Sequence, residues 1–247
     1  AGVSALAPMS RAAWPGEVEP FRRLYGYEPT DIRIGRTGYA GPGRKNPPAI
    51  YTNAKNPLTG ITLEQLARIF TTGQAGGDLT HWRQIDPGAA DRVIHVYGPR
   101  DDGGFATGLR TARMKDAPFT RRYEALPGYA DVLAAVAGDE QGIGLAGFVE
   151  GTRIPPGVKV LALAAVPGTP AALPDYASVS AGRYPLAHFI RIYVNRAPGQ
   201  PLDPLVKEYV RLALSREGQA IIAGFAASDE GYLPLVPTEL AAELAKL

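Results

Sequence analysis

Residues 92–108 read RVIHVYGPRDDGGFATG, an apolar run followed by a glycine-containing turn and a helical pattern. We expect a strand, a turn and the start of a helix. Backbone N–H groups at a helix N-terminus have no partner within the helix, and the helix dipole places partial positive charge there, so an anion can bind. Arg100 adds a planar guanidinium suited to an oxyanion. The alternative is a plain surface turn, because short glycine turns are common.

The composition is typical of a globular protein, with 45% hydrophobic and 20% charged residues among 247. This length suits one large domain or two lobes. Basic residues number 26 and acidic residues 24, a balance far from that of a nucleic-acid-binding protein, so we expect no nucleic-acid partner. The absence of cysteine excludes disulfides and thiol chemistry and is compatible with an oxidising compartment.

The beginning of the chain, residues 1–8, is apolar but lacks the basic start and the length of a signal peptide. No run approaches the roughly 18 apolar residues of a membrane span. The sequence therefore predicts a mature or truncated chain.

The clearest local pattern lies at residues 56–70. Asn-Pro-Leu-Thr-Gly at 56–60 is typical of a turn, and Thr62 with Gln65 forms a capping-box pattern that opens a helix through Phe70. Its buried face would be supplied by Leu63, Leu66, Ile69 and Phe70.

Elsewhere strand and helix patterns alternate, which predicts an α/β protein with mainly parallel sheets. Residues 158–166 are a nearly unbroken apolar run, typical of a strand buried on both faces of a parallel sheet. The glycines of 142–147 permit close approach of another backbone. We expect residues 1–53 together with 151–247 to form one discontinuous lobe and residues 54–150 an inserted second lobe. The other predicted strands are 2–9, 31–35, 49–53, 142–149 and 189–194, and the other helices 15–26, 131–137, 204–215, 218–225 and 238–246.

Seven short segments are spread along the chain, and each alone is a weak signature. The segments are 56–70, 79–82 (Leu-Thr-His-Trp), 142–147 (Gly-Ile-Gly-Leu-Ala-Gly), 182–186 (Gly-Arg-Tyr-Pro-Leu), 192–195 (Ile-Tyr-Val-Asn), 215–219 (Ser-Arg-Glu-Gly-Gln) and 231–235 (Gly-Tyr-Leu-Pro-Leu). Taken together and in this order, they resemble the phosphate-type substrate-binding proteins of bacterial ABC transporters, which belong to the periplasmic-binding-protein-like family.

The resemblance implies a two-lobed type II periplasmic-binding-protein-like fold that closes by hinge bending over a small oxyanion in an interlobe cleft. Phosphate is the leading candidate, and segments near Asn53 and Glu150 are the candidate hinges. The resemblance also implies export to the periplasm or the extracellular space, delivery of the ligand to a membrane ABC permease, and no catalytic residue, metal or cofactor.

The resemblance carries two residues directly onto the turn at 99–107. Arg100 aligns with the ligand-binding arginine of the family, and Asp102 with the acidic residue that begins an Asp-x-Ser-Gly-Thr-type turn. This turn differs from the family pattern, because glycine, phenylalanine and alanine replace the hydroxyl residues. Gly103 and Gly104 remain as backbone N–H donors, and Thr107 offers a displaced hydroxyl.

At the beginning of the chain, Leu6 stands where phosphate-specific members have an aspartate, while Ser10 and Arg11 remain as candidate contacts. The family's first strand and helix, with a Gly-Ser/Thr anion loop, have no counterpart here, so the resemblance is to a divergent and N-terminally shortened member. These departures motivate an alternative: a relative that has lost phosphate binding and acts as a protein- or polymer-interaction or sensor module.

Other chemistry has little support. His81, His95 and His188 do not have a metal-ligand spacing, and no Gly-x-Ser-x-Gly motif supports a hydrolase, which would need a serine within reach of a histidine. The glycines of 142–147 are not followed by the acidic residue and helix of a dinucleotide-binding fold. The basic, glycine-rich loop at 36–45 can contact an anion or a partner, although such loops are more often merely flexible.

Overall fold

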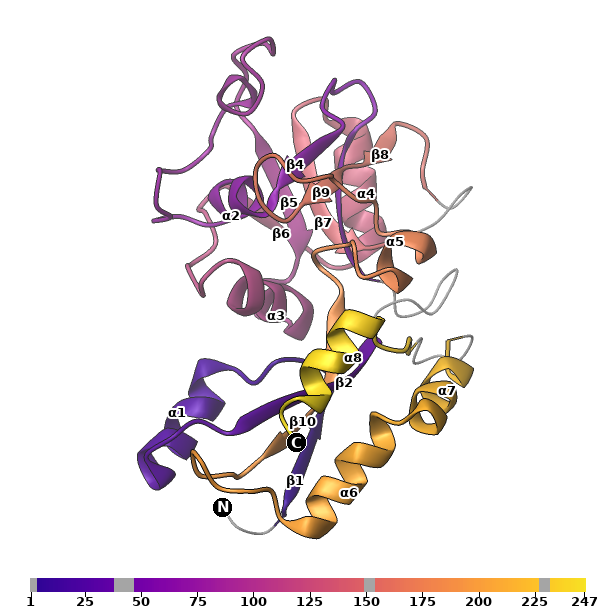
Figure 1. Ribbon diagram of the computed structural model, residues 1–247. Coiled ribbons are helices and arrows are strands. Elements are labelled where there is room, and N and C mark those ends of the chain that lie inside the picture. The colour runs from indigo at the N-terminus through magenta and orange to yellow at the C-terminus, as the bar shows by residue number, and fades with distance from the viewer. Residues whose placement is uncertain (1–3, 38–46, 149–153, 227–231) are drawn as a thin grey trace. The chain divides into compact units, whose positions relative to one another are not determined.

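The computed structural model describes residues 4–37, 47–148, 154–226 and 232–247. The chain divides into two compact units (Figure 1): a first unit of residues 1–45 and 187–247, and a second unit of residues 46–186. The predicted loop at 36–45 and the predicted hinge at Glu150 fall largely or wholly outside the described residues.

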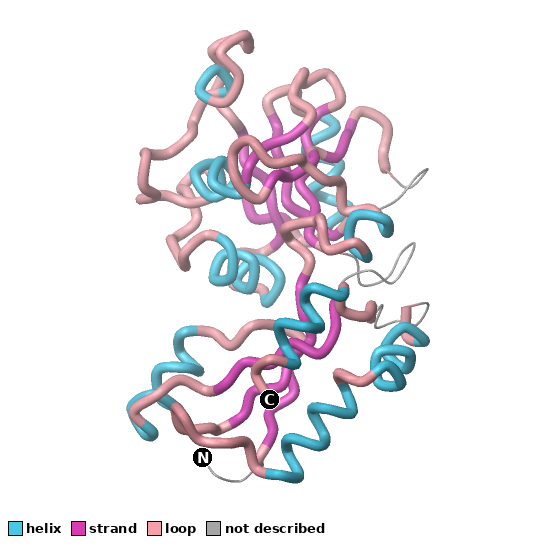
Figure 2. Tube along the Cα trace, in the orientation of Figure 1, coloured by secondary structure: helices cyan, strands magenta, loops and turns pink. Residues whose placement is uncertain are grey.

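The second unit contains a five-stranded mixed sheet (Figure 2). In it, β5 is parallel to its neighbours β6 and β7, whereas β3 is antiparallel to β7 and β8. A separate parallel pair joins β4 to β9. The strands, in sheet order, are β6 (Tyr123–Leu126), β5 (His95–Pro99), β7 (Gly142–Gly147), β3 (Pro48–Asn53) and β8 (Val158–Val160), then β4 (Gly60–Thr62) and β9 (Ala162–Ala164).

Helices flank this sheet, and glycine allows one of them to approach closely. A Cβ on Gly144 of β7 would lie 2.7 Å from Val136 and 2.9 Å from Val132, so α4 packs against the strand because Gly144 has no side chain. The close backbone approach predicted for this glycine run is present at Gly142, where a Cβ would lie 3.3 Å from Val136 Cα, whereas side chains of α4 approach Gly144. The helices are α2 (Leu63–Phe70), the 3-10 helix η1 (Trp82–Gln84), α3 (Gly104–Arg113), α4 (Tyr129–Gly138) and α5 (Tyr176–Ser180).

The predicted capping box at the start of α2 is confirmed. Gln65 N–H donates to Thr62 Oγ1 at 3.1 Å, and Thr62 N–H donates to Gln65 Oε1 at 2.9 Å. Leu66, Ile69 and Phe70 are fully buried, so the helix is held by its apolar face as well as by its cap.

The first unit contains a three-stranded antiparallel sheet in the order β1–β10–β2. Its core joins Ile32 and Ile192 of the sheet to Val206 and Val210 of α6, which runs beside the sheet in Figure 1. The elements of this unit are β1 (Leu6–Met9), α1 (Pro15–Tyr25), β2 (Thr30–Thr37), β10 (His188–Val194), α6 (Pro204–Ala213), α7 (Arg216–Gly224) and α8 (Pro237–Leu244).

The α/β class is confirmed, but the expectation of mainly parallel sheets is wrong. The sheet of the first unit is antiparallel, and the larger sheet of the second is mixed. The predicted single strand at 158–166 is also wrong. Leu161 N–H donates to Ile50 O after β8, and the chain then continues as β9 beside β4. An apolar run indicates burial. It does not indicate which strand is the partner, or in which direction that partner strand runs.

The chain passes from one unit to the other at residues that differ from the predicted lobe boundaries. β3 and β8, assigned from sequence to the first lobe, are hydrogen-bonded to each other, and β3 also pairs with β7, so they belong to the second unit. Backbone pairing across distant parts of the sequence sets this division. Among the residues that the structure describes, no helix is both long and apolar enough to cross a membrane.

Candidate functional site

The predicted strand, turn and helix at residues 92–108 are present as β5, a short turn and α3. The turn is tight, because Gly103 N–H donates to Arg100 O at 3.1 Å. Tyr123 of β6 donates to Pro99 O at 2.6 Å and so fixes the end of β5. Gly98 leaves room for that ring, since a Cβ there would lie 2.0 Å from the Tyr123 hydroxyl oxygen. Two hydrogen bonds therefore hold the backbone around Arg100: one from Tyr123 to Pro99 O, before it, and one from Gly103 N–H to Arg100 O, after it.

The first turn of α3 presents backbone donors. Gly103 is the N-cap residue, and no side chain in the described part of the chain caps this helix. Thr107 N–H makes the first helical bond, to Gly103 O at 3.0 Å. The N–H groups of Gly104, Phe105 and Ala106 come before it and have no acceptor within the helix. Together with the helix dipole, they make a favourable environment for an anion.

Arg100 directs its guanidinium at Asp102. Nε donates to Oδ1 at 3.0 Å and Nη2 to Oδ2 at 2.7 Å, and both side chains are exposed. The hydrogen bond and the attraction raise the pKa of Arg100 and lower the pKa of Asp102. A carboxylate on a guanidinium has the two-oxygen geometry that a phosphate or sulfate would present. In this structure Asp102 therefore occupies the Nε–Nη2 edge of Arg100, whose two donors can also bind an oxyanion.

Thr107 turns its hydroxyl back onto the same turn. Oγ1 donates to Asp101 O at 3.1 Å, so the side chain stabilises the turn in this structure. Whether the hydroxyl contacts a ligand stays a prediction.

A second helix begins at the same edge of the sheet. β6 is parallel to β5 with Leu126 opposite Pro99, and α4 starts just after it, with Gly128 as N-cap and no side-chain cap among the described residues. The rings of Phe105 and Tyr129, one from the first turn of each helix, lie 5.1 Å apart. This helix was predicted from sequence at 131–137, but β6 was not, so its start was not placed beside the end of β5. The signal was present in Pro127-Gly128 after a short strand-forming run.

Ser10 and Arg11 belong to the first unit, where Arg11 has structural partners. Its Nη1 and Nη2 donate to the two oxygens of Glu17 at 2.7 and 2.8 Å, and its guanidinium lies 3.9 Å above the centre of the Trp14 ring. The hydrogen bond from Arg11 is the main cause that lowers the pKa of Glu17 to about 2. Ser10 is exposed. An anion contact of either residue stays a prediction.

The histidines make local contacts. His95 Nδ1 lies 2.6 Å from Asp139 Oδ2, and Tyr97 donates to the same oxygen at 2.8 Å. Burial and this carboxylate raise the pKa of Tyr97 to about 12. His81 Nδ1 lies 2.9 Å from Thr80 Oγ1. Within the described ranges, no three histidine or acidic side chains are grouped so that they could hold a metal ion.

The chain belongs to the PBP superfamily, since the family model described as "PBP superfamily domain" matches residues 44–217. The chain is 29% identical over 250 residues to the phosphate-binding protein PstS of Pseudomonas aeruginosa, a match that covers 99% of this chain and 72% of the relative.

Two solved structures have a similar fold. The ABC-type phosphate transport receptor from Vibrio cholerae has a TM-score of 0.58 at 19% identity, over 95% of this chain and 81% of that one. PstS from Borrelia burgdorferi has a TM-score of 0.59 at 17% identity, over 95% and 80% of the two chains. The α/β architecture described above is thus shared with solved phosphate-transport proteins.

Proposed function

We propose that this chain binds a small oxyanion, with phosphate as the leading candidate, and serves as the substrate-binding component of an ABC-type uptake system. The observation that carries the proposal is the arrangement of Arg100 next to the uncapped start of α3. The name of the P. aeruginosa relative, a phosphate-binding protein, supports the choice of ligand.

When the oxyanion binds, its oxygens replace those of the Asp102 carboxylate on the Arg100 guanidinium. The exposed pair with Asp102 contributes little to stability, because water solvates both groups well. An incoming oxyanion therefore displaces the carboxylate at small cost and gains the same two donors. Its remaining oxygens accept from the first N–H groups of α3, at Gly104 and Phe105, where the helix dipole favours negative charge.

The proposed role is transport rather than catalysis. The V. cholerae neighbour is an ABC-type phosphate transport receptor, which supports a membrane ABC permease as partner and a periplasmic or extracellular location for this chain. A position of the ligand between two lobes, with further contacts from Ser10 and Arg11, stays a prediction.

Calorimetric titration with phosphate, sulfate and chloride tests the proposal. We expect saturable one-to-one binding of phosphate that weakens as salt is added, because part of the attraction is between exposed charges. Circular dichroism on the same sample shows whether the protein is folded. A folded protein that binds neither phosphate nor sulfate would refute the proposal and favour the interaction or sensor module, for which a captured protein or polymer partner that still binds Arg100→Ala would be the positive evidence.

A further inference from the structure

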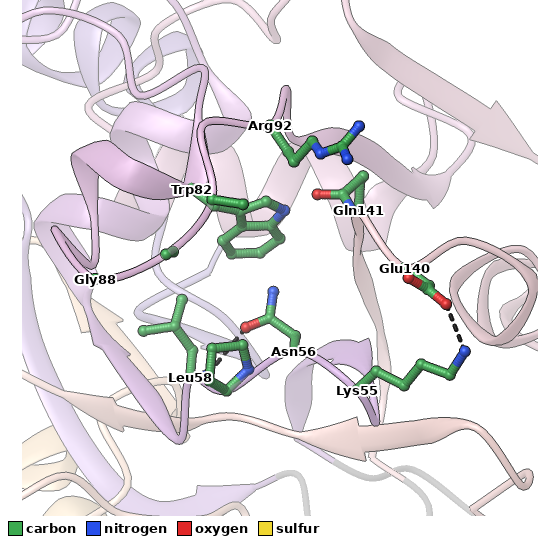
Figure 3. Close-up of a pocket in the computed structure, with 11 residues that line it drawn as sticks. Lys55, Asn56, Leu58, Trp82, Gly88, Arg92, Glu140 and Gln141 are labelled. Atoms are coloured by element: carbon green, nitrogen blue, oxygen red, sulfur yellow. Dashed lines mark hydrogen bonds and ion pairs between the residues drawn. The ribbon is translucent and has the colours of Figure 1, made fainter.

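The second unit contains a cavity of about 370 Å³ that is separate from the turn at Arg100 (Figure 3). Arg92 and Gln141 line it, and they precede β5 and β7 in the chain. The cavity thus lies at the amino ends of these parallel strands, whereas Arg100 follows the carboxyl end of β5. Five strand residues separate the two ends, a span of about 16 Å.

Trp82 forms one wall of this cavity and carries a buried donor that has no acceptor. The side chain is 3% exposed, and its Nε1 has no hydrogen-bond partner in the described part of the chain. The indole N–H can only donate, and buried donors in native proteins are nearly always paired. Trp82 N–H donates to Arg92 O at 3.0 Å, so the backbone holds the ring in place. In Figure 3 the indole nitrogen is on the side of the ring that faces Gln141.

Asn56 supplies a second donor in the same cavity. It is 7% exposed, and its Oδ1 accepts from Leu58 N–H at 3.0 Å. This bond fixes the orientation of the amide, so that the Nδ2 group points toward the indole in Figure 3. Two neutral N–H donors from different segments therefore line one small volume.

The rim is charged and one wall is apolar. Arg92 is exposed at the rim, whereas Lys55 is paired with Glu140 at 2.5 Å. Leu58 and the face of Trp82 provide apolar surface. With Lys55 and Glu140 neutralising each other, Arg92 leaves the rim with a net positive charge.

We propose that this cavity is a second binding site, which takes a small organic carboxylate. Its oxygens accept from Trp82 Nε1–H and Asn56 Nδ2–H, Arg92 attracts its charge, and its carbon chain packs against Leu58 and the indole. A monoanion with an apolar body fits two neutral donors and one exposed cation better than inorganic phosphate, which has oxygens on every side and no surface to place against the apolar wall.

The indole N–H signals of the protein, followed by NMR, test the site directly. The chain has two tryptophans, so Trp14 of the first unit is an internal control. The probes are acetate, butyrate, benzoate and inorganic phosphate. We expect butyrate and benzoate to shift the Trp82 signal saturably, acetate to bind more weakly because it lacks a carbon chain, and phosphate to leave that signal in place. The Trp14 signal should stay unchanged.

Two substitutions and one control distinguish a built site from general electrostatic attraction. Arg92→Gln should weaken butyrate binding by about tenfold, since a contact to a charged group is lost. Arg83→Gln removes the same charge from an exposed residue that does not line the cavity, and it should change little. Trp82→Phe keeps an aromatic ring but removes the donor, and should abolish saturable butyrate binding measured by calorimetry, in a protein that circular dichroism shows to be folded.

The outcomes are distinct from those of the proposed function. If butyrate and benzoate leave the Trp82 signal unmoved while phosphate binds, the cavity holds only water and the inference is wrong. It is also wrong if phosphate shifts Trp82 as strongly as butyrate does, or if Arg92→Gln and Arg83→Gln have equal effects. A saturable carboxylate shift in a protein that binds no phosphate would support this site and refute the proposed function.

Discussion

Arg100 and Arg11 each hold a carboxylate, yet their surroundings differ. Arg100 is 72% exposed and pairs with Asp102, two residues further along the same turn. Arg11 is 34% exposed, lies over Trp14 and binds both oxygens of Glu17. Glu17 in turn accepts from Trp14 N–H at 2.8 Å at the start of α1.

The two arginines therefore differ in the role that their surroundings favour. Arg100 can exchange its partner for a ligand, whereas Arg11 supports the fold. Replacing Asp102 on Arg100 disturbs only a local, solvated pair. Replacing Glu17 on Arg11 would disturb more, because Glu17 also accepts from Trp14 N–H at the start of α1 and the Arg11 guanidinium lies over the Trp14 ring. Both arginines are candidate ligands by sequence, and their partners suggest different uses.

The largest expected effect is that of Arg100→Gln on phosphate binding. The loss of a charged two-donor contact should weaken binding at least tenfold, by about 1.5–3 kcal/mol for a hydrogen bond to a charged group. The unfolding midpoint should hardly change, because the side chain is exposed. Titration calorimetry measures the affinity. Arg121→Gln, which removes an exposed arginine of the same unit, is the control and should bind phosphate normally.

The helix start can be tested at Gly104. Proline is tolerated at the first position of a helix, and Gly103 already has the extended backbone that a following proline requires. Gly104→Pro therefore removes one N–H donor without breaking α3, and should weaken phosphate binding by roughly fivefold to tenfold. Gly104→Ala keeps the donor, and its Cβ meets nothing within 4 Å. Equal affinity of the two variants would mean that this N–H does not contact the anion.

Asp102→Asn should strengthen binding by a small factor, about threefold. The substitution removes the carboxylate that competes for Arg100 and a negative charge near the anion. The gain should shrink at high salt, because the groups are exposed. A loss of affinity in low salt would mean that Asp102 orients Arg100 for binding rather than competing with the ligand.

The smallest effect concerns the pH dependence of the first unit. The folded-state pKa of Glu17 is about 2, below its ordinary value of 4.5. Its contribution to stability is therefore complete above about pH 4.5 and disappears as the pH falls through about 2. Glu17→Gln should lower the thermal midpoint slightly at neutral pH, and the difference from wild type should vanish near pH 2. Phosphate affinity at neutral pH should be unaffected. Thermal scans at several pH values check this.

Local patterns predicted most of the elements. The capping box of Thr62 and Gln65, the glycines of β7 and the turn before α3 each depend on neighbours in the sequence, and all three are present. The direction of strand pairing, the break at Leu161 and the short strand β6 depend on partners far along the chain. Their sequence patterns contain no information about those partners.

The candidate site was likewise predictable only where it depends on consecutive residues. Arg100 and the start of α3 were predictable because strand, turn and helix are consecutive. The pairing of Arg11 with Glu17 was not predicted, although a helix starting near Pro15 was. The cavity beside Trp82 could not be predicted either, since it joins segments from residues 55–58, 82–92 and 140–141.

If the first turn of α3 holds the anion, its backbone N–H groups must respond to phosphate. Amide NMR signals of the folded protein, followed during a phosphate titration with a chloride control, measure this response. We expect the N–H signals of Gly104, Phe105 and Ala106 to shift saturably with phosphate, in step with the calorimetric binding curve, and not with chloride. Saturable phosphate binding that leaves all three signals unmoved would mean that the anion does not bind at the start of α3.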